Sequence, residues 1–162
     1  MNEDRARGRT AGRGRATRRP ADSRTVKLDF ASRLDLLEIV QTVLAQVSGG
    51  LGLDEDAQHY MSVAVRESVV NAIKHGNRND EARRVQVAFT VAPETFRIEV
   101  RDEGGGFDPE TVPNPLAEEN LLKPYGRGIF FMKSFMDDVS YSFGKRGGTV
   151  VRLTKKIPAR AS

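Results

Sequence analysis

The residues with the clearest chemical potential lie in the stretch ESVVNAIKHGN, residues 67–77, inside a run of apolar residues at helical spacing. Glu67, Asn71 and His75 are each four residues apart, so in a helix their side chains share one face. A carboxylate, an amide and an imidazole along one helix edge suit a polar site better than a core. An Asn oxygen can bind Mg²⁺ beside nucleotide phosphates, and a carboxylate one turn away can accept a proton from an attacking hydroxyl group. This stretch therefore predicts a magnesium–nucleotide site.

The same spacing has a plainer interpretation, because Glu-x-x-x-Asn is common on the solvated faces of helices. For His75 we favour a structural role at the end of the helix over contact with a ligand. His59 is expected at the surface. The two histidines lack a supporting cluster of carboxylates, and the sequence has no cysteine. Neither a zinc site nor a cysteine nucleophile is therefore expected.

A second group of candidate residues follows an alternating strand that ends at Asp102, just before Glu103 and three glycines. A carboxylate at a strand end can accept a hydrogen bond from the exocyclic amine of adenine. Gly104 and Gly106 have no side chain, so the backbone there can approach a ligand closely. Thr149 follows two glycines at the start of the last strand and can direct its hydroxyl group toward the base or toward Asp102. Each stretch is also consistent with an ordinary glycine-rich turn beside a strand.

A third candidate, Gly126-Arg127-Gly128, opens a helix. Free N–H groups and the helix dipole favour phosphate at such a position, and Arg127 adds positive charge. A plain junction between a loop and a helix is an equally good interpretation of a lone G-x-G. The preceding residues, 108–125, contain four prolines and several acidic residues. A long connection of this kind inside a compact domain is usually a lid or a binding loop.

The elements that must hold these residues follow from the periodicity of the apolar side chains. Alternation predicts strands over residues 24–30, 85–91, 96–100, 139–143 and 150–153. Helical spacing predicts helices over residues 34–47, from about 54 to 76, and over 129–136. Ser32 is the expected cap of the first helix, and Asp54 or a neighbour caps the second. The expected core face of the second helix consists of Tyr60, Val63, Ala64, Val69, Val70 and Ile73.

Strands joined as hairpins, with the helices grouped apart from them, predict an α+β fold. We expect a two-layer sandwich with helices on one face of a mixed, mainly antiparallel sheet. A length of 162 residues fits one compact domain. The expected division is an Arg-rich tail over residues 1–23, the folded domain over 24–157 and a short C-terminal tail over 158–162.

The positive charge of the protein belongs to its N-terminal tail. Residues 1–23 carry seven arginines and three acidic residues, an excess that equals the whole net charge of +4. This tail has no large apolar side chain after Met1 and is expected to be disordered. It is either a weak tether for nucleic acid or an acidic partner, or a solubilising leader, which we favour. No apolar run is long enough to span a bilayer and no secretory signal is present, so we expect a cytoplasmic protein without membrane contact.

In their order along the chain, these motifs resemble the N, G1, G2 and G3 boxes of the GHKL ATPases, whose fold is the Bergerat or histidine-kinase-like ATPase fold. The resemblance rests on E-x-x-x-N-A-x-x-H-G, D-x-G-x-G, a lid, G-x-G at a helix and G-T on a strand, and it covers residues 24–156. The stretch Gly126–Ile129, followed by Met132 and by Ser134–Asp137, is similar to the anti-sigma-factor serine kinases of bacterial partner switching.

The resemblance implies a role for each candidate residue. Glu67 would be the catalytic base, Asn71 the Mg²⁺ ligand and Asp102 the group that recognises the adenine of ATP. The glycines and the threonine would shape the two ends of the nucleotide site: Gly104, Gly106 and Thr149 around adenine, and Gly126, Arg127 and Gly128 beside the phosphates.

It further implies an ATP- and Mg²⁺-dependent protein serine kinase that acts as an anti-sigma factor. Such a protein binds a sigma factor, phosphorylates a STAS-type anti-anti-sigma protein and is often a homodimer. Pro124 stands where relatives often carry a basic residue, two positions before the first lid glycine. This difference favours a second hypothesis, a weakly catalytic ATP-gated switch that sequesters a regulator without phosphorylating it. A third hypothesis, a nucleic-acid-associated protein, rests on residues 1–23.

Overall fold

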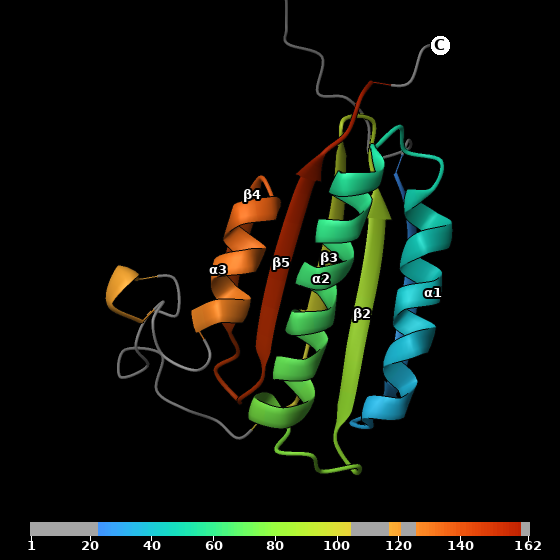
Figure 1. Cartoon of the computed structure of the whole chain (residues 1–162). Coiled ribbons are helices and arrows are strands. Elements are labelled where there is room, and N and C mark those ends of the chain that lie inside the picture. Colours follow the sequence, from blue (N-terminus) through green and yellow to red (C-terminus); the bar gives the residue numbers. More distant parts are fainter. Residues whose placement is uncertain (1–22, 105–116, 121–125, 160–162) are drawn as a thin grey trace, which may run out of the picture.

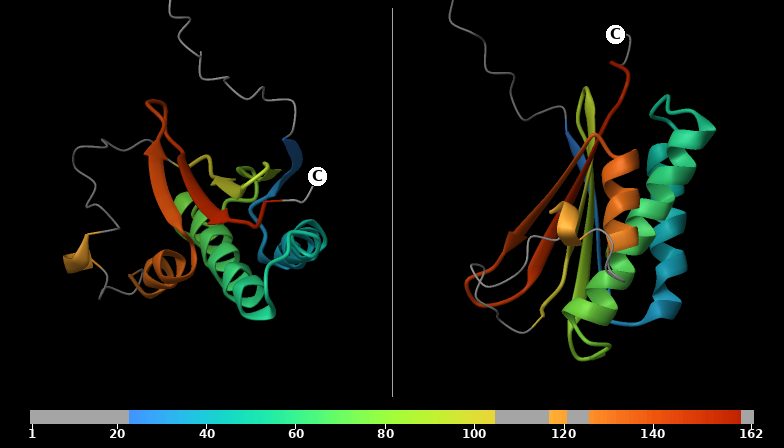
Figure 2. Two further views of the ribbon diagram at one scale, coloured as in Figure 1. Left: turned by 90° about the horizontal axis from the view of Figure 1, so that it is seen from above. Right: turned by 60° about the vertical axis from the view of Figure 1, so that its left-hand side comes forward.

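The computed structural model describes residues 23–104, 117–120 and 126–159, which form one sheet covered by helices on one face (Figures 1 and 2). The sheet has the strand order β1-β2-β3-β5-β4, and all four pairings are antiparallel. The expected α+β sandwich is thereby confirmed, with an antiparallel sheet. The strands are β1 (Arg24–Ala31), β2 (Arg84–Val91), β3 (Thr95–Arg101), β4 (Asp138–Phe143) and β5 (Thr149–Lys156).

Three α-helices form the layer that covers the sheet, and the described residues also contain short turns of other helix types. The α-helices are α1 (Leu37–Ser48), α2 (Glu55–Asn71) and α3 (Gly126–Phe135). The short elements are the 3-10 helices η2 (Leu34–Leu36) and η4 (Glu118–Asn120) and the π-helical turn η3 (Ala72–Gly76). Helix α2 lies between α1 and α3 and covers the middle of the sheet (Figure 1). Within the described part of the chain, no helix has the length and apolarity to cross a membrane.

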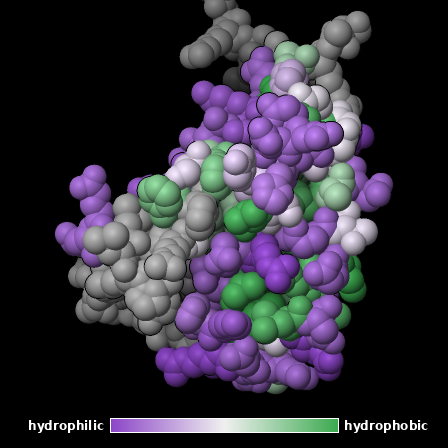
Figure 3. All heavy atoms as spheres, viewed as in Figure 1, coloured by the Kyte–Doolittle hydropathy of each residue, from purple (hydrophilic) through white to green (hydrophobic). Residues whose placement is uncertain are grey.

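The core lies between the sheet and the three helices. Alternate residues of the central strands, such as Val87, Phe89, Ile98 and Leu153, are buried against the helical layer. The residues that alternate with them along each strand face the other side of the sheet, as the period of two requires. On the outer surface of the helical layer, hydrophilic side chains predominate and hydrophobic ones gather in a few patches (Figure 3).

The buried stripe of α2 agrees only in part with the one expected. Met61 and Val65 are fully buried, whereas Tyr60 is 39% exposed and stacks on Phe135 of α3, with ring centroids 3.9 Å apart. The expected Val63 and Val70 are only half-buried. Ala64, Val69 and Ile73 are fully buried, as expected. Tyr60 lies at the edge of the core instead, where α3 offers it an aromatic partner. Ser68 belongs to this buried stripe.

The two expected helix caps have different outcomes. Asp54 caps α2 as expected, because its carboxylate accepts a hydrogen bond of 2.7 Å from the backbone N–H of Ala57. The prediction for Ser32 is wrong. Arg33 occupies the cap position of η2, and the Ser32 hydroxyl group instead donates to the backbone carbonyl of Arg83 at 2.8 Å. Ser32 therefore joins the end of β1 to the segment that precedes β2.

The end of α2 is held by Asn77, which is fully buried after the π-helical turn. Its Nδ2 donates to the Ser32 hydroxyl oxygen at 2.7 Å and to the Arg84 carbonyl at 2.9 Å. Its Oδ1 accepts from the backbone N–H of Glu103 at 2.8 Å. One amide group thus links α2 to β1, β2 and the end of β3. The next residues, Arg78 and Asn79, both have a φ of 56°, so the chain reverses direction sharply.

We expect Asn77→Ala to lower the free energy of unfolding by about 3 kcal/mol, because three hydrogen bonds are lost and their buried or partly buried partners remain. Ser32→Ala should cost less, and the double variant should cost less than the sum, since the two residues share a bond. Chemical denaturation of the three variants measures these effects. A loss below about 1 kcal/mol for Asn77→Ala would contradict a central role for this residue.

Candidate functional site

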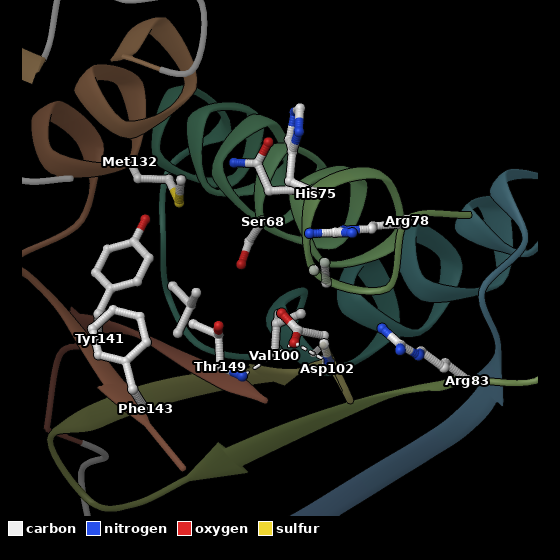
Figure 4. Close-up of a pocket in the computed structure, with 15 residues that line it drawn as sticks. Ser68, His75, Arg78, Arg83, Val100, Asp102, Met132, Tyr141, Phe143 and Thr149 are labelled. Carbon is white, nitrogen blue, oxygen red and sulfur yellow. Dashed lines mark hydrogen bonds between the residues drawn. The ribbon is translucent and has the colours of Figure 1, made fainter. Parts of the chain in front are cut away.

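A cavity of about 470 Å³ opens between the C-terminal part of α2 and the adjoining ends of strands β3, β4 and β5 (Figure 4). Helix α2 and the turn after it contribute polar groups and small residues, and the strands contribute a carboxylate and apolar walls. The lining residues are Ser68, Asn71, Ala72, His75, Gly76, Arg78, Arg83, Val100, Asp102, Gly104, Met132, Tyr141, Phe143, Thr149 and Val151. The structure therefore brings four of the candidate residues together: Asn71, Asp102, Gly104 and Thr149.

Asp102 is the buried carboxylate of this cavity, with 6% of its surface exposed. One of its oxygens, Oδ1, accepts hydrogen bonds from the backbone N–H groups of Gly104 at 2.9 Å and Thr149 at 3.1 Å. The other oxygen, Oδ2, is directed into the cavity (Figure 4). Burial raises the pKa of Asp102 above its ordinary value, and the two backbone donors oppose this rise. The side chain is thus held in one orientation and offers one acceptor to a ligand.

Three glycines make room for Asp102 and its backbone. A Cβ atom at Gly76 would overlap with the Asp102 carboxylate, and one at Gly104 would lie 2.7 Å from the Gly76 carbonyl oxygen. Gly148 has a φ of +86°, and a Cβ there would lie 2.7 Å from the Asp102 carbonyl oxygen. The sequence pattern predicts only that Gly76 lies at the end of a helix and that Gly148 lies in a glycine-rich turn. Their contact with Asp102 depends on the pairing of β5 with β3, which sequence spacing does not reveal.

Helix α2 and the π-helical turn η3 that follows it contribute one continuous face to the cavity. Ser68, Asn71, Ala72 and His75 recur at intervals of three and four residues and all line it. His75 is exposed and lines the cavity, so it lies at the candidate site as well as at the helix end. Ser68 is 1% exposed, and its Oγ has no hydrogen-bond partner. Ser68 was not among the candidate residues, because the sequence pattern gives no sign that its hydroxyl group lacks a partner.

Glu67 does not line this cavity. It is half-buried and lies against the first turn of α3, where a Cβ atom at Gly128 would be 2.7 Å from Glu67 Oε2. The lack of a side chain at Gly128 thus allows α3 to approach α2 closely. Gly126 begins α3, while Gly106, the Arg127 side chain and all of the expected lid except residues 117–120 lie outside the described residues. The face expected from Glu67 to His75 is therefore divided between the cavity and the α2–α3 contact.

The remaining walls combine apolar surface with positive charge at one side. Met132 and the strand residues Tyr141 and Phe143 lie together on one side of the cavity (Figure 4). Burial raises the pKa of Tyr141 to about 12, so its hydroxyl group is neutral near pH 7. Arg78 and Arg83 line the opposite side (Figure 4). Apolar walls with one carboxylate suit a flat heteroaromatic ring that carries an amino group.

Comparisons with known proteins identify the family to which this fold belongs. Residues 30–155 match the family described as the histidine kinase-like ATPase domain. The chain is 26% identical over 139 residues to the serine-protein kinase RsbW of Staphylococcus aureus (strain JH9), a match that covers 82% of this chain and 86% of that protein. Its fold is similar to that of the RsbU and RsbW domains of Rv1364c from Mycobacterium tuberculosis. The TM-score there is 0.60 and the identity 20%, over 86% of this chain and 34% of that one.

The family match includes every residue that lines the cavity, from Ser68 to Val151. It also confirms the relationship expected from the order of the sequence motifs. On these grounds the chain belongs to the family of histidine kinase-like ATPase domains, the GHKL superfamily.

Proposed function

We propose that this protein is an ATP- and Mg²⁺-dependent protein serine kinase that acts as an anti-sigma factor in partner switching. Membership in an ATPase family implies that it uses ATP. The observation that carries the proposal is the buried Asp102 carboxylate, oriented by two backbone N–H groups and directed into a cavity that Asn71 also lines. The named serine-protein kinase of similar length supports the kinase assignment.

The cavity fits the nucleotide on independent physical grounds. The close packing of Gly76 and Gly104 leaves the cavity side of Asp102 unobstructed, and the apolar walls can cover a planar base. In this proposal Asp102 Oδ2 accepts a hydrogen bond from the adenine amino group, with Gly104, Gly106 and Thr149 around the ring. The Ser68 hydroxyl group makes no hydrogen bond within the protein, so it is available to a ligand.

The metal and the phosphates belong at the other end of the site. Asn71 would hold Mg²⁺ through its side-chain oxygen, and the ion, when bound, would neutralise charge that develops on the transferred phosphoryl group. Among the described residues, no group of three or more His, Asp or Glu side chains could hold a metal. Phosphates and water would therefore supply most of the other ligands. Gly126, Arg127 and Gly128 would border the phosphates at the start of α3.

Glu67 would accept the proton of the substrate serine as its hydroxyl oxygen attacks the γ-phosphate of ATP. This residue lies one helical turn before Asn71 and next to the start of α3, so base, metal ligand and phosphate-binding turn share one region. A half-buried carboxylate held between two helices is well positioned for such a step, because its orientation is restricted by packing.

The proposed partners are a sigma factor, bound by the protein, and a STAS-domain anti-anti-sigma protein, which carries the substrate serine. A homodimer and a weak contact of residues 1–23 with nucleic acid or an acidic partner are further parts of the proposal. So is the division into a tail over 1–23, an ATP-binding domain over 24–157 and a tail over 158–162.

The direct test is transfer of label from [γ-³²P]ATP to STAS-domain proteins of the same genome in the presence of Mg²⁺. We expect one of these proteins to be labelled on serine, and chelation of the metal should abolish the label. A protein that binds ATP but labels none of the candidates would contradict the kinase proposal.

The second candidate function is an ATP-gated switch that sequesters a regulator without phosphorylating it. The feature that favours it is Pro124, which stands where relatives often carry a basic residue near the lid glycines. In this case ATP would change the affinity for the sigma factor, while no phosphate would appear on any STAS protein. Measuring sigma-factor binding with ATP and with a non-hydrolysable analogue distinguishes the two functions, because only the kinase needs transfer.

A further inference from the structure

Ser68 is the feature of the cavity that the proposed roles leave unexplained. Its side chain is 1% exposed, and its Oγ is the one buried side-chain polar atom without a hydrogen-bond partner among the residues that the structure describes. The side chain comes from α2, and its oxygen is directed into the cavity, toward the side that Asp102 and Thr149 form (Figure 4).

The missing partner is unusual for a serine inside a helix. Such a hydroxyl group commonly donates to the carbonyl four residues earlier, as Ser134 does to Phe130 at 2.8 Å and Thr42 does to Glu38 at 2.8 Å. The Ser68 hydroxyl group makes no such bond, so no protein group compensates for its burial. The residues four positions before and after it, Ala64 and Ala72, are buried alanines of the same stripe. Alanine would therefore serve packing equally well at this position.

We propose that the Ser68 hydroxyl group recognises the nucleobase, donating a hydrogen bond to the ring nitrogen next to the exocyclic amino group, directly or through one water. This inference rests on the proposed binding of ATP. On the adenine edge an amino donor lies beside a ring-nitrogen acceptor, N1. Asp102 offers the acceptor that the amino group requires, and the Ser68 hydroxyl group offers a donor that the nitrogen requires. Together they would bind two neighbouring atoms on the same edge of the base.

The proposal predicts that Ser68 contributes to binding and not to folding. Ser68→Ala removes only the hydroxyl group and leaves the small side chain that its neighbours on the stripe already have. The affinity for ATP should fall roughly three- to ten-fold, which corresponds to the net free energy of one neutral hydrogen bond. The melting temperature without nucleotide should stay the same or rise, because a buried atom without a partner is removed.

The decisive comparison uses 1-deaza-ATP, in which a C–H group replaces the ring nitrogen N1. Calorimetric titration of the full chain with both nucleotides gives four dissociation constants. We expect Ser68→Ala to weaken ATP binding and to leave 1-deaza-ATP binding unchanged. Ser48→Ala is the matched control, because Ser48 is a buried helical serine of α1 that does not line the cavity, and it should leave both affinities unchanged.

Three results would overturn the proposal: unchanged ATP affinity in Ser68→Ala, an equal loss for both nucleotides, or a fall in melting temperature that accounts for the loss. The first excludes a contact with the base, and the other two indicate a packing role. Failure of the wild-type protein to bind any ATP would refute the proposed function itself. The two failures are distinguishable. If the proposed function fails, the wild-type protein itself gives no binding signal with ATP. If only the role of Ser68 fails, the wild type and Ser68→Ala bind ATP equally well.

Discussion

Asp102→Asn is expected to lower the affinity for ATP by about 100-fold and to make ITP, whose base carries a carbonyl in place of the amino group, the better ligand. In the wild type, Oδ1 is occupied by the backbone N–H groups of Gly104 and Thr149. The Asn oxygen must keep that position, because Nδ2 cannot accept these bonds. The amide N–H₂ group then faces the cavity and meets the adenine amino group, donor against donor. Isothermal titration with the two nucleotides measures the reversal.

Two controls separate base recognition from a general loss of structure. Binding of ITP by Asp102→Asn would itself show that the variant is folded. Glu103→Gln is the matched substitution at the adjacent exposed residue. Its side-chain oxygen can still accept from the backbone N–H of Arg84, as Glu103 does at 2.7 Å, so ATP affinity should be unchanged. Equal losses of ATP and ITP affinity in Asp102→Asn would argue against a contact between this carboxylate and the amino group.

The pH dependence of binding offers a further check on Asp102. Burial raises the pKa of this carboxyl group above its ordinary value of 3.8. The ionised form is the one that accepts the hydrogen bond through Oδ2, so ATP affinity should be complete above the raised pKa and decline as the pH falls through it. The decline should therefore begin at a higher pH than for an ordinary aspartate, and it should be absent from Asp102→Asn.

Glu67→Gln is expected to reduce phosphoryl transfer by about 100-fold or more while ATP affinity changes little, because only the ability to accept the proton is lost. The glutamine has nearly the same shape, so the close approach of Gly128 to this side chain can be kept. Single-turnover transfer to the cognate STAS protein measures the rate, and titration measures the affinity.

The matched control for Glu67 is the substitution Glu38→Gln. Glu38 is an exposed glutamate of α1 whose Oε1 lies 3.9 Å from Nη1 of Arg66. The substitution should leave both transfer and binding unchanged. If Glu67→Gln transferred phosphate at the wild-type rate, Glu67 would not be the base. If it lost transfer and ATP affinity to the same degree, Glu67 would act in binding or in the packing of α2 against α3.

The strands and the helix ends were largely accessible to sequence reasoning, since they follow from local rules. The β2–β3 hairpin alternates apolar and polar residues so regularly that its predicted bounds, 85–91 and 96–100, each fall within one residue of the observed strands. The cap at Asp54 follows from the same kind of local chemistry. The cap expected at Ser32 and the inward position expected of Tyr60 were wrong, because remote partners determine both: Asn77 and Arg83 for the first, Phe135 for the second.

The sequence by itself determined the class of fold and the identity of the main groups, because periodicity and motif order are properties of the chain. Only the tertiary structure decided how those groups are distributed. It directs Asp102 Oδ2 into a cavity that Asn71 also lines, sets Glu67 against Gly128 outside that cavity, and leaves the Ser68 hydroxyl group buried without a partner. The physical reason is that the packing of α2 against the sheet and against α3 determines which way the helix is rotated about its own axis. If the helix were rotated by the angle between two adjacent residues, about 100°, a side chain that lines the cavity would be replaced by one that is now buried.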